Sequence, residues 1–168
     1  MTVHLTIQPK GWDETITALG KYDQVVSREN HKAMNKSVLL VERVAKQEAP
    51  MGATGHLKSS LVHLVEKAGI GQVVGTVGTH IGYGPAVELG TPPHNPNVKN
   101  LRYWVERKFG LKGRDAARVT FLVGRKIRRA GTKAQPFLDP AFTGNQEKIE
   151  GYFEQALDNI VNELAKQP

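Results

Sequence analysis

Hydrophobic side chains recur at steps of three and four residues through the first long segment of the chain, residues 22–48. This spacing puts them on one face of a helix and predicts a long amphipathic helix there. The positions concerned are Val26, Ala33, Met34, Val38, Val41, Val44 and Ala45. Before this segment, residues 3–7 alternate apolar and polar types and predict a strand, and Asp13 is a suitable N-cap for a short helix over residues 13–19.

The hydrophobic period changes to two residues after the long helix. Residues 57–67 and 72–81 both alternate, and a glycine-containing turn separates them. This pattern predicts a β-hairpin. Thr54 and Gly55 lie just upstream, and we expect them to cap or turn the chain into the first strand.

Glycine interrupts the second of these strands and the segment after it. The chain turns at residues 82–85, and residues 86–89 amount to one helical turn that Gly90 ends. Glycine inside a strand lets another backbone approach closely, or marks a bulge. Here that backbone could belong to a second subunit.

Helical spacing returns in the second half of the chain. Residues 98–109 predict a helix that Gly110 ends, and residues 115–129 predict a second helix. A wheel of the second helix separates an apolar side from an arginine stripe. The apolar side holds Ala116, Val119, Val123 and Ile127, and the stripe holds Arg114, Arg118, Arg125 and Arg129. Phe121 and Leu122 flank the stripe, which favours docking against a partner.

Residues 135–138 are expected to be extended, and Asp139 followed by Pro140 is typical of the start of a helix, here the final one. The elements together predict one α+β domain over residues 1–168. It consists of a small antiparallel β-sheet packed against a long N-terminal helix and a C-terminal helix, with a two-helix basic insertion at residues 98–130.

Positive charge is concentrated in that insertion. The chain has a net charge of +7, and residues 99–133 hold twelve Lys or Arg against two acidic residues, a net charge of +10. The remainder therefore carries −3. This asymmetry indicates an anionic partner, either nucleic acid or an acidic surface of another protein or subunit.

The composition and motifs argue against several classes of function. The chain has no cysteine, and neither a signal peptide nor a membrane-spanning run is evident, so we expect a non-secreted protein without a membrane partner. His80, Glu88, His94 and Asp139 could be assembled into a site. They lack the spacing of a metal motif, and no nucleophile elbow or phosphate loop is present. We therefore expect no enzyme activity, no catalytic or metal residue and no cofactor.

Three motifs together carry a resemblance to a known family. They are A-P-x-x-x-T-G-x-L-x-x-S at residues 49–60, V-G-T with Y-G-P-A-V-E-L-G-T within residues 77–91, and G-T-x-x-Q-P-F-L-x-P-A-F at residues 131–142. The combination resembles the tail-component family of long-tailed bacteriophages and prophages, which includes neck and tail-completion proteins. This chain departs from many relatives in the two-helix segment between its two Gly-Thr motifs.

The resemblance implies a structural virion protein of the neck or tail, assembled in the cytoplasm of a bacterial host. Such proteins form a ring that joins the tail to the head, and tail symmetry suggests a hexamer. The implied partners are copies of the chain itself, the head connector or stopper, and the tail tube or tail terminator. DNA passes through the ring and could make non-specific contacts with it.

The candidate contact residues fall into two groups. The predicted subunit-interface residues are Gly75, Thr76, Gly78, Tyr83, Glu88, Thr91, Pro136 and Phe137. Among these, Glu88 either pairs with a basic group of the next subunit or is solvated, and the segment around Phe137 is either a strand leading into the core or a subunit contact. The predicted contacts to an anionic partner or DNA are Arg114, Arg118, Arg125, Arg128 and Arg129. Three interpretations of these arginines stay open: a solvated face, a contact with another protein, or a contact with the DNA backbone. The last would make the chain a nucleic-acid-binding module.

Overall fold

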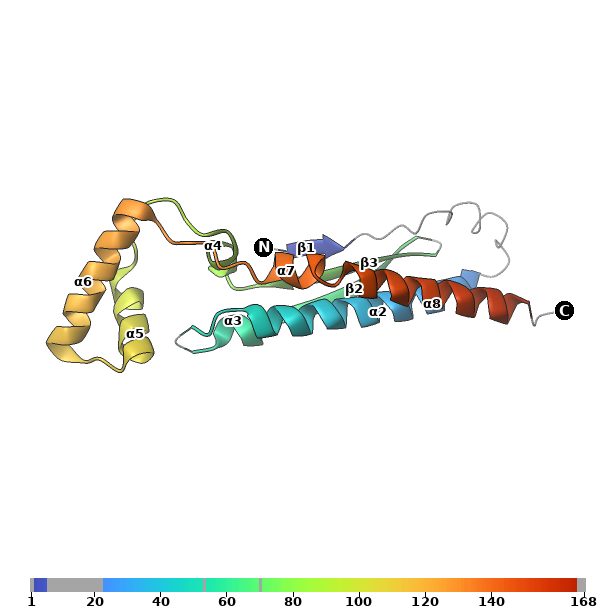
Figure 1. Cartoon of the computed structure of the whole chain (residues 1–168), viewed down its shortest axis with the longest axis horizontal. Coiled ribbons are helices and arrows are strands. Elements are labelled where there is room, and N and C mark those ends of the chain that lie inside the picture. The colour runs from blue at the N-terminus through green and yellow to red at the C-terminus, as the bar shows by residue number, and fades with distance from the viewer. Residues whose placement is uncertain (1, 6–22, 53, 70, 166–168) are drawn as a thin grey trace.

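The computed structural model describes residues 2–5, 23–52, 54–69 and 71–165. The chain is an elongated α+β structure (Figure 1). Its elements are β1 (Thr2–Leu5), α2 (Asp23–Glu48), α3 (His56–Ser59), β2 (Leu61–Gly69), β3 (Gln72–Thr79), α4 (Gly84–Leu89), α5 (Val98–Phe109), α6 (Gly113–Ala130), α7 (Leu138–Thr143) and α8 (Gln146–Leu164). The short helix predicted over residues 13–19 lies outside the described residues.

Within the described residues the strands form an antiparallel sheet in the order β1-β3-β2. The predicted hairpin is confirmed, with Val65 of β2 opposite Gly75 of β3. Its first strand begins only at Leu61, because the one-turn helix α3 occupies the start of the predicted range. Gly55, with φ of 70°, turns the chain into α3. Because β1 pairs with one edge of β3 along residues 75–78 and β2 pairs with the other edge, the glycine-rich strand is central in the described sheet, and both of its edges at Gly75, Thr76 and Gly78 are occupied by strands of the same chain.

Helix α2 covers one face of the sheet, and a glycine makes this possible. A Cβ atom on Gly75 would lie 2.5 Å from both Met34 Sδ and Val38 Cγ1 of α2. Met34 and Val38 are themselves fully buried in the main core. The structure thus corrects the expectation of a second subunit at this position, because the close neighbour of Gly75 is a helix of the same chain.

The predicted C-terminal helix is present but is divided in two. α7 ends at Thr143 and α8 begins at Gln146, with Gly144 and Asn145 between them. The buried Asn145 side chain donates a hydrogen bond to the carbonyl of Ala141 (2.8 Å), which stabilises the break. α8 then runs along α2 and buries its apolar face, made of Ile149, Phe153, Ala156 and Ile160.

Helices α5 and α6 form a hairpin at one end of the molecule, far from the C-terminal end of α8 (Figure 1). They pack on each other, with Val105 of α5 and Ala116 of α6 fully buried. Gly110 ends α5 in the left-handed conformation, with φ of 66°, as predicted. Both helices of the predicted insertion are therefore confirmed.

Candidate functional site

Glu88 is buried and caps a helix that lies 50 residues further along the chain. It belongs to α4, and its side-chain carboxylate accepts main-chain hydrogen bonds from Phe137 (2.8 Å), Leu138 (3.1 Å) and Asp139 (3.0 Å). These N–H groups begin α7, where they have no partner within the helix. The prediction that Glu88 is solvated or pairs with the next subunit is therefore corrected: its charge is used inside the chain, at a helix N-terminus that favours an anion.

The two Gly-Thr motifs meet each other at the base of the α5–α6 hairpin. Thr91 and Thr132 form an antiparallel bridge, each main-chain N–H donating to the other's carbonyl at 3.1 Å. Their hydroxyl oxygens lie 2.9 Å apart. Gly90 and Gly131 have positive φ values of 72° and 70°, and a Cβ atom on Gly131 would lie 1.9 Å from the Thr91 carbonyl oxygen. Thr91, predicted at a subunit interface, thus joins the two chain segments that enter and leave the helical hairpin. We call this contact the Thr91–Thr132 bridge.

The other predicted interface residues are divided between the core and the surface. Phe137 is fully buried in the main core, which corrects its assignment to a subunit contact. Gly78 is buried in the central strand, and Thr76 beside it is half-buried. Pro136 and Tyr83 are exposed, Tyr83 to 49%. They stay candidates for contact with another molecule.

The face of the sheet turned away from α2 exposes apolar side chains. Val62 and Leu64 of β2 are 55% and 53% exposed. They lie opposite Gly78 and Thr76 of β3, so these positions share one face, while alternate positions such as Val77 pack toward α2. Exposed apolar residues grouped on a flat surface are typical of a protein-contact site.

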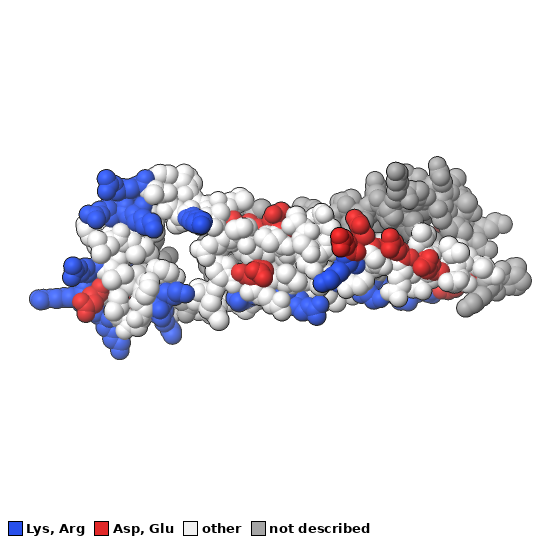
Figure 2. Space-filling model, viewed as in Figure 1, with Lys and Arg blue, Asp and Glu red and all other residues white. Residues whose placement is uncertain are grey.

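The basic surface lies on the α5–α6 hairpin, as Figure 2 shows. The predicted arginines of α6 are all exposed, and none of them forms an ion pair with a residue that the structure describes. Phe121 and Leu122 are 59% and 45% exposed among them. A cavity of about 360 Å³ between α5 and α6 adjoins this surface, with Phe121 and Arg128 in its lining. The structure thus brings the predicted arginines together and adds an apolar component.

Acidic side chains gather on the outward face of α8 (Figure 2). They are Glu147, Glu150, Glu154 and Asp158, and all are exposed. Within the described part of the chain none of them has an ion-pair or hydrogen-bond partner. Leu157 and Val161 lie on the same side of the helix and are 37% and 54% exposed. This surface combines negative charge with apolar side chains.

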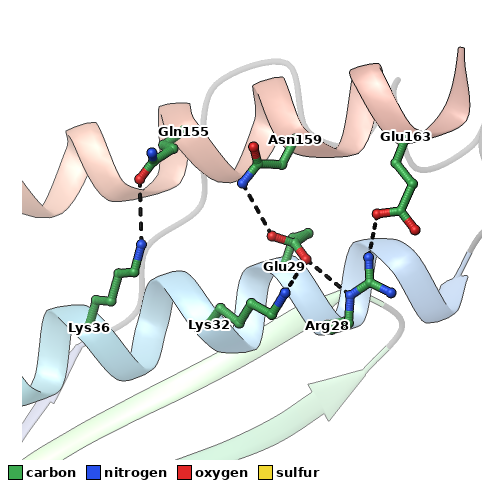
Figure 3. Close-up of polar contacts among 7 residues, drawn as sticks. All are labelled: Arg28, Glu29, Lys32, Lys36, Gln155, Asn159 and Glu163. Atoms are coloured by element: carbon green, nitrogen blue, oxygen red, sulfur yellow. Dashed lines mark hydrogen bonds and ion pairs between the residues drawn. The ribbon is translucent and has the colours of Figure 1, made fainter. Parts of the chain in front are cut away.

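The inner side of α8 is tied to α2 by a polar cluster (Figure 3). The buried Glu29 accepts hydrogen bonds from Lys32 (2.7 Å), Arg28 (3.0 Å) and Asn159 of α8 (3.3 Å). Arg28 also pairs with Glu163 of α8. The hydrogen bond from Lys32 holds the pKa of Glu29 below its ordinary value of 4.5, and those from Arg28 and Asn159 act in the same direction against burial. The cluster fixes which face of α8 points outward.

Two of the four polar residues that could be assembled into a site, Glu88 and His94, have local hydrogen-bond partners in the folded chain. Both carboxylate oxygens of Glu88 accept hydrogen bonds from main-chain N–H groups. His94 Nδ1 lies 3.2 Å from the Thr91 hydroxyl oxygen, in the loop after the Thr91–Thr132 bridge. In the described ranges, no group of three or more His, Asp or Glu side chains could hold a metal ion. No described helix is both long and apolar enough to cross a bilayer.

Comparisons with known protein families, with characterised proteins and with solved structures found no match to this chain. The functional argument therefore depends on the residues and the surfaces described above.

Proposed function

We propose that this chain is a structural subunit of a long-tailed phage or prophage, a neck or tail-completion protein whose copies form a ring between tail and head connector. One observation carries the proposal. The chain exposes apolar side chains on separate surfaces of a long, narrow molecule, represented by Leu64 of the sheet, Phe121 of α6 and Val161 of α8. Repeated contacts with several neighbours need several such surfaces, whereas a substrate site needs one concave pocket.

The internal architecture is compatible with this role. Two of the three motifs that resemble the phage family, those within residues 77–91 and 131–142, meet in the folded chain, because Glu88 caps the segment that begins at Phe137 and Thr91 pairs with Thr132. These motifs therefore build the frame that carries the helical hairpin. The contacts with neighbours fall to the surfaces around that frame.

Deletion of the coding sequence from the phage or prophage that encodes this chain tests the proposal. We expect filled heads and separate tails to accumulate, as seen by negative-stain electron microscopy, and purified protein to restore joining when it is added to them. Particles with normally joined tails in the deletion strain would contradict the proposal.

A second function, non-specific binding of duplex DNA, is favoured by the exposed arginines of α6. Arg118 and Arg125 point outward without ion-pair partners among the described residues, as phosphate-binding arginines do. If this is the function, the purified protein should shift arbitrary duplex in a gel, with affinity falling steeply as salt rises. Duplex binding that survives the double change Arg118→Glu and Arg125→Glu would rule out this surface as the DNA site.

A further inference from the structure

The outward face of α6 has a definite order of side chains. Along the helix it presents Arg114, Arg118, Phe121, Leu122, Arg125 and Arg129, all of them exposed. Two arginines precede an apolar pair, and two follow it. Because arginine and aromatic side chains are enriched at protein interfaces, this order indicates a surface that binds protein.

The outward face of α8 has the opposite charge and a similar design. It presents Glu147, Glu150, Glu154, Leu157, Asp158 and Val161, again all exposed. At 1.5 Å per residue, the arginine face of α6 extends over about 22 Å and this face of α8 over about 21 Å. The two faces therefore agree in length as well as being opposite in charge.

These faces cannot meet within one molecule. α6 lies in the hairpin at one end, and α8 runs toward the other end (Figure 1). α6 packs on α5, and α8 packs on α2 through the cluster around Glu29 (Figure 3). Each outward face is therefore available to a different molecule.

We propose that the outward face of α6 in one copy binds the outward face of α8 in the next copy. The contact is heterologous, since it uses two different surfaces of the chain, and repetition of such a contact closes a ring when the rotation between copies allows it. This inference rests on the proposed function, because it specifies the joint between neighbouring subunits of the ring.

Either relative direction of the two helices gives a chemical match. In the parallel arrangement the facing pairs are Arg114 with Glu150, Arg118 with Glu154, and Phe121 with Leu157. In the antiparallel arrangement they are Arg125 with Glu154, Arg129 with Glu150, and Leu122 with Leu157. Both arrangements put apolar side chains together at the centre with charge pairs beside them, the usual anatomy of a protein interface.

The apolar centre distinguishes this partner from DNA. Arginines alone would suit phosphate groups, but Phe121 and Leu122 would face the charged backbone of a duplex without any apolar surface to cover them. Leu157 and Val161 of α8 supply that apolar surface.

A charge-swap experiment tests the proposal in the full chain. One variant carries Arg118→Glu and Arg125→Glu, and the other carries Glu150→Lys and Glu154→Lys. Each variant alone opposes like charges at the joint, so we expect self-association measured by sedimentation velocity at low salt to weaken by about tenfold or more. An equimolar mixture should regain wild-type association, because each altered face then meets a complementary one.

A control variant removes the same amount of charge from another part of the hairpin. Lys99→Glu with Lys108→Glu changes two exposed lysines of α5, outside the arginine face of α6, and its association should stay close to that of the wild type. The proposal would be overturned if self-association weakened equally in this control, or if it did not recover in the mixture of the two charge-swap variants. The weakening would then reflect the overall charge of the protein and not a specific joint.

Cross-linking provides a measurement that detects even weak association. The chain has no natural cysteine, so Leu122→Cys and Leu157→Cys can each be introduced alone. A mixture of the two should form a disulfide-linked heterodimer faster than either forms a homodimer, and faster than Leu122→Cys mixed with Leu39→Cys on α2. Equal rates would overturn the α6–α8 joint. Absence of preferred heterodimer formation, together with salt-sensitive duplex binding that depends on Arg118 and Arg125, would assign α6 to DNA instead.

The two proposals can fail separately. If the deletion strain makes unjoined heads and tails but no α6–α8 cross-link forms, this joint is wrong and the neck function stands. If the cross-link forms but the deletion strain makes complete particles, the chain self-associates for a different purpose.

Discussion

The side chain of Glu88 accepts a hydrogen bond from the main-chain N–H of Leu138 at 3.1 Å, and both residues are buried. The contact joins the end of the glycine-rich segment to the start of α7. Because it lies beside the Thr91–Thr132 bridge, it also anchors the base of the helical hairpin. The α5–α6 hairpin, which carries the arginine face, is therefore attached to the main core partly through a buried carboxylate.

Removing that carboxylate should destabilise the fold. In Glu88→Ala the first N–H groups of α7 lose their acceptor in a buried setting, and we expect the free energy of unfolding to fall by about 3 kcal/mol. Glu88→Gln keeps one acceptor oxygen and should cost less. Urea unfolding followed by circular dichroism measures both, with Glu66→Ala, an exposed glutamate of β2, as the control. Wild-type stability in Glu88→Ala would show that the cap contributes little.

The close approach of α2 to the sheet leads to a second prediction. Gly75→Ala puts a Cβ atom within 2.5 Å of Met34 Sδ and Val38 Cγ1, and overpacking of this kind costs about 1 to 3 kcal/mol. Gly52→Ala is the matched control, since a Cβ there has no atom within 4 Å. The double variant Gly75→Ala with Val38→Ala should recover part of the loss in thermal unfolding. If Gly75→Ala is as stable as Gly52→Ala, the packing described here is wrong.

Local patterns were sufficient to predict several elements. The three- and four-residue spacing of apolar positions predicted α2, and Gly110 marked the end of α5 because a left-handed C-cap requires little beyond the local chain. The two-residue alternation predicted the β2–β3 hairpin. Of the candidate site, the arginine face of α6 followed from the helical wheel alone, since exposure of a continuous polar stripe depends mainly on the helix that carries it.

The remaining features depend on contacts between residues far apart in the sequence, which local patterns do not indicate. Nothing near Glu88 in the sequence indicates that it caps a helix fifty residues away, and its position on a one-turn helix favoured a surface role. Asp139 and Pro140 have the order of a helix start, yet the capping carboxylate comes from Glu88. The glycines of β3 predict a close approach or a bulge, but the identity of the neighbour at Gly75, which is α2, depends on tertiary packing.

The Thr91–Thr132 bridge at the base of the hairpin supplies a third prediction. Gly131→Ala combines a positive φ of 70° with a Cβ atom 1.9 Å from the Thr91 carbonyl oxygen, so the Thr91–Thr132 bridge should open. Hydrogen exchange at the Thr91 and Thr132 amides should accelerate, while exchange in α2 stays slow. Gly113→Ala, with a φ of 57° and no atom within 4 Å of the added Cβ, isolates the cost of the positive φ. Equal exchange at the bridge in both variants would contradict the steric explanation.

The polar cluster between α2 and α8 predicts a dependence of stability on pH. The pKa of Glu29 in the folded chain lies below its ordinary value of 4.5, because Lys32, Arg28 and Asn159 stabilise the ionised carboxylate. The stabilisation is therefore complete above pH 4.5 and is lost as the pH falls through the lowered pKa. Glu29→Gln should reduce the free energy of unfolding by about 1.5 to 3 kcal/mol at neutral pH, the usual value of hydrogen bonds to a charged group. The difference from the wild type should shrink below pH 4.5, in urea unfolding measured from pH 7 to pH 3. Glu66→Gln, which changes an exposed carboxylate, should have the same free energy of unfolding as the wild type at each pH. If the loss of stability in Glu29→Gln stays constant down to pH 3, the charge of Glu29 does not hold α8 on α2.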